Sequence, residues 1–320
     1  MSSLHPQVQQ LVAALATKPP AAPWEVSITA YREAGERLAV LAGLPDDGCA
    51  VTELAIPVRR GSVNARHYRP PGESVGPAVV YLHGGGFVRG SLDSHDRLCR
   101  ALCMRGGLGV VSVAYRLAPE NQFPAAHNDA FDALRWVSQH AGELMIDPTA
   151  LAVAGDSSGG ALAAATALAT RSVGPPLKAQ GLLCPALDAT MSSGSVDRYH
   201  AGPLLTREGL AWSYDQYVPD AGDRRSAQVS PLFEETLAAA PPAIIISAQI
   251  DPVADDARRY AEALATAGVA VKAREYAGMP HSFMLLAGVL EDGEHALTAF
   301  ANDLAELVKS GRAGPGPCAS

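Results

Sequence analysis

Short apolar runs alternate with longer stretches that carry apolar residues at helical spacing over most of this 320-residue chain. Strands that are buried on both faces appear as continuous apolar runs, whereas a helix lying on a sheet shows a single apolar stripe. The alternation of the two patterns predicts an α/β fold, with a mostly parallel central sheet and helices on both faces. The predicted strands lie at 78–82, 109–115, 150–155, 179–184, 243–248 and 269–276, and the predicted helices lie at 95–105, 124–140, 158–170, 253–267 and 294–308.

Four segments depart from this alternation. Residues 1–45 precede the strands and contain two helix-like stretches separated by prolines, so we expect an appended N-terminal element. Residues 51–69 have the alternating pattern of two strands joined by a turn. Residues 186–240 interrupt the rhythm and include a predicted helix at 206–217, which indicates an insertion between two strands. The last ten residues, 311–320, are rich in glycine and proline and predict a flexible tail.

The predicted strand at 150–155 leads directly into Gly-Asp-Ser-Ser-Gly-Gly at 155–160 and then into a helix. A Gly-x-Ser-x-Gly sequence in a strand–turn–helix context exposes the serine hydroxyl at the carboxyl edge of the sheet, near the free N–H groups of the helix N-terminus. The alternative is an ordinary turn or a phosphate-binding loop. Such a loop normally brings a lysine or a Gly-x-Gly-x-x-Gly pattern, and this turn has neither. Ser158 falls on the first helical position, so Ser157, which alone lies between both glycines, is the predicted nucleophile.

A serine nucleophile needs a general base, and the base needs an acid that orients it. In an open α/β sheet these groups come from loops at the carboxyl ends of later strands. Asp251 and His281 each follow one of the last two predicted strands, and they are 30 residues apart, the length of one helix and one returning strand. Of the nine histidines, only His281 has this position. The predicted triad is therefore Ser157, Asp251 and His281, with Asp255 and Asp256 as other candidates for the acid.

Three consecutive glycines follow the predicted strand at 78–82, within His-Gly-Gly-Gly-Phe at 83–87. Acyl transfer places negative charge on the carbonyl oxygen, and removing one fixed donor to that oxygen typically costs about 2.7–4 kcal/mol. Backbone N–H groups can approach a substrate closely where no Cβ intervenes. We therefore expect an oxyanion hole built from Gly84, Gly85 and Gly86, with the N–H of Ser158 on the opposite side. A merely flexible turn is the alternative.

Several motifs spread over most of the chain resemble those of the hormone-sensitive-lipase-like carboxylesterases, a branch of the α/β-hydrolase fold. They are His83–Phe87, Tyr115–Glu120, Phe123-Pro124, Gly155–Gly160, Asp251–Asp256 and His281. The family commonly has alanine after the nucleophile, where this chain has Ser158, but only the backbone N–H is needed there.

The resemblance implies how the chain is organised and what it does. Residues 1–45 would form the N-terminal cap helices, and residues 46–310 would form the catalytic domain with a cap insertion at about 186–240. The implied activity is that of a serine carboxylesterase that hydrolyses short-chain, soluble esters through an acyl-enzyme, with no cofactor and no metal. Arg116 and Glu120 are expected to tie their loop together near the active site without a catalytic role.

Composition excludes some classes of partner and is compatible with the small-molecule ester that the resemblance implies. The formal net charge is −8, which disfavours a nucleic-acid binder. We find neither a signal peptide nor a long uncharged apolar run, so we expect no membrane span. The five cysteines are widely spaced, and the Cys99–Cys103 pair is a poor zinc signal, which indicates free thiols in a reducing cytoplasm. The composition leaves a homodimer open.

Two other functions stay open at this level. An amidase or arylformamidase would use the same triad and oxyanion hole. A non-catalytic small-molecule-binding relative would keep the fold and lose a triad member. All three predicted members are present here, which favours the enzyme.

Overall fold

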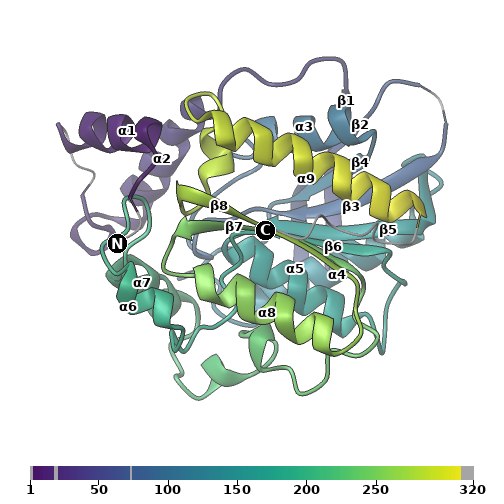
Figure 1. The fold of residues 1–320 in the computed structure, drawn as a ribbon. Coiled ribbons are helices and arrows are strands. Elements are labelled where there is room, and N and C mark those ends of the chain that lie inside the picture. Colours follow the sequence, from purple (N-terminus) through teal and green to yellow (C-terminus); the bar gives the residue numbers. More distant parts are fainter. Residues whose placement is uncertain (1–2, 18–20, 73, 311–320) are drawn as a thin grey trace.

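An eight-stranded sheet forms the centre of the computed structural model, which describes residues 3–17, 21–72 and 74–310 (Figure 1). The strand order is β1-β2-β4-β3-β5-β6-β7-β8. The β1–β2 and β2–β4 pairs are antiparallel, and the pairs from β4 to β8 are parallel. The strands are β1 (Ala50–Val58), β2 (Gly61–Arg69), β3 (Gly76–Leu82), β4 (Gly109–Val113), β5 (Ile146–Asp156), β6 (Ala179–Leu183), β7 (Ala243–Ile250) and β8 (Val271–Pro280). The predicted fold class, a mostly parallel sheet in an α/β fold, is confirmed.

Helices cover both faces of the sheet because the apolar side chains of its central strands alternate between two cores. On β3, Val80 and Leu82 belong to one buried cluster, and Val79 and Tyr81 belong to the other. The helices α4 (Ala125–Gln139), α5 (Ser158–Ala169) and α8 (Ala254–Thr266) contribute to the first cluster, and α3 (Asp96–Gly106) and α9 (Glu291–Ser310) contribute to the second (Figure 1).

The strand order reverses between β4 and β5, because β3 has β4 on one side and β5 on the other. Loops that leave adjacent strands in opposite directions open a crevice at the carboxyl edge of a parallel sheet, and ligands bind there. The loops after β3 and β5 are the glycine loop and the turn that carries Ser157. The topology therefore brings these two segments together.

The remaining helices lie at the end of the molecule beyond the carboxyl ends of β7 and β8 (Figure 1). They are α1 (Pro6–Ala16), α2 (Ile28–Leu38), α6 (Gly194–Arg198) and α7 (Arg207–Tyr217). The N-terminal segment and the insertion touch there, since the rings of Tyr31 and Trp212 are edge-to-face with centroids 5.2 Å apart. Short 3₁₀ turns complete the chain: η1 (Pro23–Glu25), η2 (Ala39–Ala42), η3 (Asp223–Arg225), η4 (Pro231–Phe233) and η5 (Phe283–Leu286).

The C-terminal end of β8 differs from the prediction. β8 continues to Pro280, although its apolar pattern stops near Tyr276. The extension is held by backbone pairing with β7 across an irregularity in register, with Ile250 opposite Pro280, and such pairing leaves no apolar pattern in the sequence. The short helix α6 was not predicted either. The expected tail at 311–320 lies outside the described residues.

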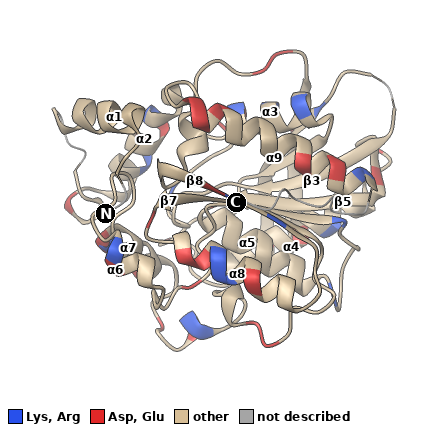
Figure 2. Ribbon diagram, viewed as in Figure 1, with Lys and Arg blue, Asp and Glu red and all other residues tan. Residues whose placement is uncertain are grey.

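Charged residues of both signs are intermixed over the outer helices and loops, while the central strands are almost free of them (Figure 2). This view shows no face on which basic residues gather. None of the helices in the described part of the chain combines the length and apolar character that crossing a bilayer would require.

Candidate active site

Ser157 occupies a strained turn between β5 and α5. Its backbone φ is 52° and its ψ is −118°, a combination that is rare for a residue with a side chain. Its N–H donates to Leu183 O at 2.8 Å, and its carbonyl accepts from Ala186 N–H at 3.2 Å, so the turn is held from β6 and the segment after it. A Cβ at Gly159 would overlap the carbonyl of Leu82, which explains the glycine after the serine pair. This is the geometry of a nucleophile elbow.

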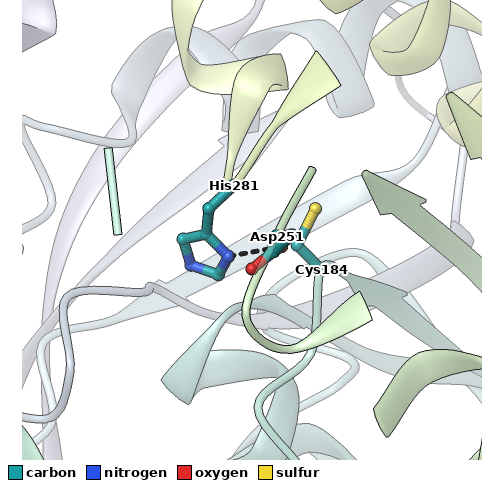
Figure 3. A group of neighbouring side chains, drawn as sticks. All are labelled: Cys184, Asp251 and His281. Atoms are coloured by element: carbon teal, nitrogen blue, oxygen red, sulfur yellow. Dashed lines mark hydrogen bonds and ion pairs between the residues drawn. The ribbon is translucent and has the colours of Figure 1, made fainter. Parts of the chain in front are cut away.

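The three residues predicted to act together lie in one hydrogen-bonded chain. The Nε2 atom of His281 is 2.8 Å from Ser157 Oγ. Its Nδ1 atom is 2.7 Å from Asp251 Oδ2 (Figure 3). The other carboxylate oxygen, Oδ1, accepts from Val253 N–H at 3.0 Å. Asp251 is 1% exposed and His281 is 8% exposed. The two residues follow the last positions of β7 and β8, so the parallel pairing of those strands sets the distance between them.

The other two candidates for the acid point elsewhere. Asp255 forms an ion pair with Arg258. Asp256 is buried and accepts hydrogen bonds from Leu187 N–H at 3.0 Å and from Ser193 Oγ. Burial, with the like charge of Asp188 added, raises the pKa of Asp256 to about 8. Asp256 therefore anchors the start of the insertion to α8.

Cys184 lies beside Asp251, a placement that the sequence analysis did not foresee (Figure 3). Its sulfur and the ligand atoms of Asp251 and His281 are all within 4.8 Å of one another, and these residue types can bind a transition metal. However, His281 and Asp251 already hydrogen-bond to each other, and burial raises the pKa of the Cys184 thiol well above its usual range. A metal would need the thiolate, so the geometry favours the hydrogen-bonded triad.

Each of the three glycines in the loop after β3 is required for a different steric reason. A Cβ at Gly84 would overlap the carboxylate of Asp156, and a Cβ at Gly85, whose φ is +124°, would overlap the carbonyl of Arg89. Gly86 has a φ of +64°, and a Cβ there would lie 2.6 Å from Ser213 Oγ on α7. The insertion thus rests directly on the glycine loop. A larger side chain at any of the three positions would displace this packing.

The N–H groups of this loop have different partners. That of Gly84 donates to Asp156 Oδ1 at 2.8 Å. Within the ranges that the structure describes, the N–H groups of Gly85, Gly86 and Ser158 have no protein acceptor. The Ser158 hydroxyl has a contact of its own, because its Oγ accepts from Phe87 N–H at 3.2 Å.

The buried carboxylate of Asp156 links the glycine loop to the nucleophile elbow. Besides Gly84 N–H it accepts from Tyr81 Oη at 2.8 Å, and its Oδ1 lies 3.1 Å from His95 Nε2. Burial by itself would raise the pKa of Asp156, but His95 and the hydrogen bonds outweigh it and lower the pKa. Sequence reasoning missed this residue. The one available signal was a charged residue at the end of an otherwise apolar strand.

Three further residues of these loops, His83, Arg116 and Glu120, make structural contacts. His83 Nδ1 is 2.9 Å from Gly84 O, and its ring stacks on Tyr115 with a centroid separation of 4.3 Å. Burial lowers the pKa of His83 to about 4, so the ring is neutral at physiological pH. Arg116 and Glu120 tie their loop to different helices. Arg116 pairs with Asp129 on α4, whereas Glu120 pairs with α2.

Comparisons with known proteins agree with this geometry. A family model described as alpha/beta hydrolase fold matches residues 79–285. An ethyl acetate hydrolase of Pseudomonas putida is 40% identical over 84% of this chain and 86% of the relative. A carboxylesterase, NlhH, of Mycobacterium tuberculosis is 42% identical over 67% of this chain and 68% of the relative. A solved esterase structure from Pyrobaculum calidifontis is 39% identical with a TM-score of 0.88, covering 95% of this chain and 99% of that one. Since the family model and these relatives agree over most of its length, the chain belongs to the hormone-sensitive-lipase-like carboxylesterase family of the α/β-hydrolase fold.

Proposed function

We propose that this carboxylic ester hydrolase acts through an acyl-enzyme on Ser157, with His281 as the base and Asp251 as the orienting acid. The observation that carries the proposal is the unbroken hydrogen-bonded chain from Ser157 Oγ through both ring nitrogens of His281 to Asp251, at 2.8 and 2.7 Å. A base within this distance of the hydroxyl can accept its proton without moving. The buried carboxylate holds the ring in the tautomer whose Nε2 is free to accept that proton.

The reaction has two halves. Ser157 Oγ bonds to the ester carbonyl carbon as its proton passes to His281 Nε2, and the carbonyl oxygen becomes an oxyanion. The carbonyl re-forms as the alcohol leaves with that proton. Water then attacks the acyl-serine, again losing a proton to His281, and the acid departs as the proton returns to Ser157 Oγ. Asp251 stays ionised throughout and stabilises the imidazolium.

We propose Gly85, Gly86 and Ser158 as the oxyanion donors. Their backbone N–H groups have no protein acceptor in the described fold. Gly84 belonged to the predicted set, but its N–H is already given to Asp156. Its role in this proposal is to hold the loop while the next two residues bind the oxyanion.

We further propose that residues 1–45 and about 186–240 form a cap that limits the acyl pocket. Support comes from the position of α7 over Gly86 and from the ring of Tyr217, which stacks on Phe87 with centroids 4.0 Å apart. These contacts pack the insertion against the glycine loop. The name of the P. putida relative points to an ester with a short acyl group, which agrees with a preference for short-chain, soluble esters.

A panel of p-nitrophenyl esters from C2 to C16, tested with the wild type and Ser157→Ala, examines the proposal. We expect turnover to be highest at short acyl lengths and to vanish in the variant. Faster turnover of C16 than of C4, or a jump in rate when tributyrin exceeds its solubility, would contradict the short-chain proposal. A p-nitroanilide of the best acyl group tests the amidase alternative.

The location and the assembly of the protein are also proposals. We propose a cytoplasmic location because Cys99, Cys103 and Cys184 are buried and free, as in reducing compartments. A homodimer remains a proposal, and light scattering of the purified protein would decide it.

A further inference from the structure

One face of α2 packs on the segment that follows the three glycines. The ring of Tyr31 lies under the guanidinium of Arg89, 4.6 Å from the ring centroid to Cζ. Gly35 leaves room for the same side chain, since a Cβ there would be 3.1 Å from Arg89 Cδ. Glu36 accepts a hydrogen bond from Ser91 Oγ at 3.0 Å. The N-terminal segment therefore contacts the loop that carries the proposed oxyanion donors, and does more than cover the site.

Arg32 lies at the centre of this contact. Its Nε donates to Val88 O at 2.8 Å, and its Nη2 donates to Ala118 O at 2.9 Å. Both terminal nitrogens also bind the carboxylate of Glu120, at 2.9 and 2.7 Å. A guanidinium offers five donors in a rigid fork, and here the fork joins α2 to two separate loops at once.

The carbonyls that Arg32 binds belong to segments that also hold each other. Ala118 N–H donates to Phe87 O at 2.9 Å, and Val88 N–H donates to Gly85 O at 3.2 Å. A shift of Val88 would therefore move the turn that begins at Gly85. Oxyanion donors act only when they lie about 2.7–3.1 Å from the developing charge, so a small displacement of this turn weakens them.

We propose that Arg32 is a positioning residue that holds the glycine loop in the geometry required by the oxyanion donors. The N-terminal segment then contributes to the rate of the chemical step as well as to the walls of the pocket. This inference rests on the proposed function. Arg32 touches neither the nucleophile nor its base in the described structure, and it acts through Val88 and Ala118.

The competing explanation is that Arg32 only fastens α2 through its ion pair with Glu120. The carboxylate of Glu120 is 55% exposed, and exposed ion pairs contribute about 0–1 kcal/mol to stability. Under this explanation Glu120→Gln would reproduce the effect of Arg32→Ala. Under our proposal the effect of Glu120→Gln would be much milder, because the hydrogen bonds from Arg32 to Val88 O and Ala118 O remain.

The test compares Arg32→Ala, Arg32→Lys and Glu120→Gln with a matched control, Arg37→Ala. Arg37 is on the same helix, but its side chain is 70% exposed and only approaches Glu33, at 4.0 Å. Two quantities are measured: kcat and KM for p-nitrophenyl butyrate, and the inhibition constant of an alkyl trifluoromethyl ketone. This inhibitor forms a hemiketal with Ser157 whose oxygen occupies the oxyanion hole, so it reports on the donors directly.

We expect Arg32→Ala to lower kcat by about tenfold or more with KM within about twofold, and to weaken the ketone by a similar factor. Arg32→Lys, which can still donate to one carbonyl, should fall between Arg32→Ala and the wild type, and it keeps the test decisive if the alanine variant does not fold. Arg37→Ala and Glu120→Gln should stay within about twofold of the wild type.

The inference would be overturned by an unchanged kcat in both Arg32 variants, by a change confined to KM, or by an equal loss in Glu120→Gln. A lower kcat with unchanged ketone binding would also overturn it, because the oxyanion donors would then be intact. Failure of the proposed function looks different, since the wild type itself would neither hydrolyse the ester nor bind the ketone.

Discussion

The carboxylate of Asp156 accepts the backbone N–H of Gly84 at 2.8 Å. This bond joins the residue before the proposed nucleophile to the loop of the proposed oxyanion hole. The two parts of the site come from β5 and β3, which are neighbours at the point where the strand order reverses. One buried carboxylate thus sets the position of the attacking atom relative to the groups that receive the negative charge.

Replacing this carboxylate should damage both stability and catalysis. In Asp156→Ala, Tyr81 Oη and Gly84 N–H lose their buried acceptor, and each unsatisfied group costs about 1–3 kcal/mol. We expect the free energy of unfolding, measured in urea, to fall by about 2–6 kcal/mol, and kcat to fall with it. Glu143→Ala, an exposed residue just before the same strand, serves as the control and should change stability by about 0.5 kcal/mol or less. Equal effects of the two substitutions would refute the proposed role of Asp156.

Alanine substitutions of the two neighbouring serines should differ sharply in their effect on activity. Ser157→Ala should abolish ester hydrolysis and leave the circular dichroism spectrum unchanged, because only the nucleophile is removed. Ser158→Ala should lower kcat by roughly two- to tenfold, since it removes the acceptor of Phe87 N–H, a hydrogen bond worth about 0.5–1.5 kcal/mol. If the Ser157 variant retained most of the activity, or if the Ser158 variant lost as much, the assignment of the nucleophile would be wrong.

Asp251→Asn should keep the fold and lose most of the activity. The amide would favour the other tautomer of His281, whose Nε2 carries a proton and cannot accept one from Ser157. The corresponding change in a serine protease triad lowers kcat by about 10⁴. Steady-state kinetics with p-nitrophenyl butyrate would show the loss. Asp255→Asn, on the adjacent helix, is the control and should retain wild-type kcat.

The buried carboxyl of Asp256 should make stability depend on pH. Its pKa is raised to about 8 in the fold, against about 3.9 for an unperturbed aspartate. A group with a raised pKa stabilises the fold while it is protonated, and this contribution is lost as pH rises through the folded pKa. The carboxyl ionises near pH 4 in the unfolded chain and near pH 8 in the fold, so the wild type should lose stability relative to Asp256→Asn between about pH 4 and pH 8.

Urea unfolding of both proteins across this range measures the difference. The asparagine stays neutral at every pH and can accept the N–H of Leu187 as the carboxyl does. Parallel stability curves for the two proteins would show that Asp256 is ionised in the fold throughout.

The sequence by itself determined the class of fold and the three residues of the proposed triad. Each of these residues follows the end of an apolar run, and the run is visible because burial on both faces of a parallel sheet demands it. Ser157, Asp251 and His281 could therefore be placed at one edge without coordinates. The exact strand ends could not, since β8 continues through backbone pairing that requires no particular side chains.

Only the tertiary structure decided how the loops around the triad are held. Gly84 and Asp156 are 72 residues apart, Phe87 and Ser158 are 71 apart, and Arg32 and Val88 are 56 apart. Each of these three hydrogen bonds joins a backbone carbonyl or N–H group to a polar side chain. Every residue offers such backbone groups, so nothing in the local pattern marks which of them a distant side chain will reach. The residues of the proposed triad can be recognised in the sequence, but the loops that position them are fixed only when the chain folds.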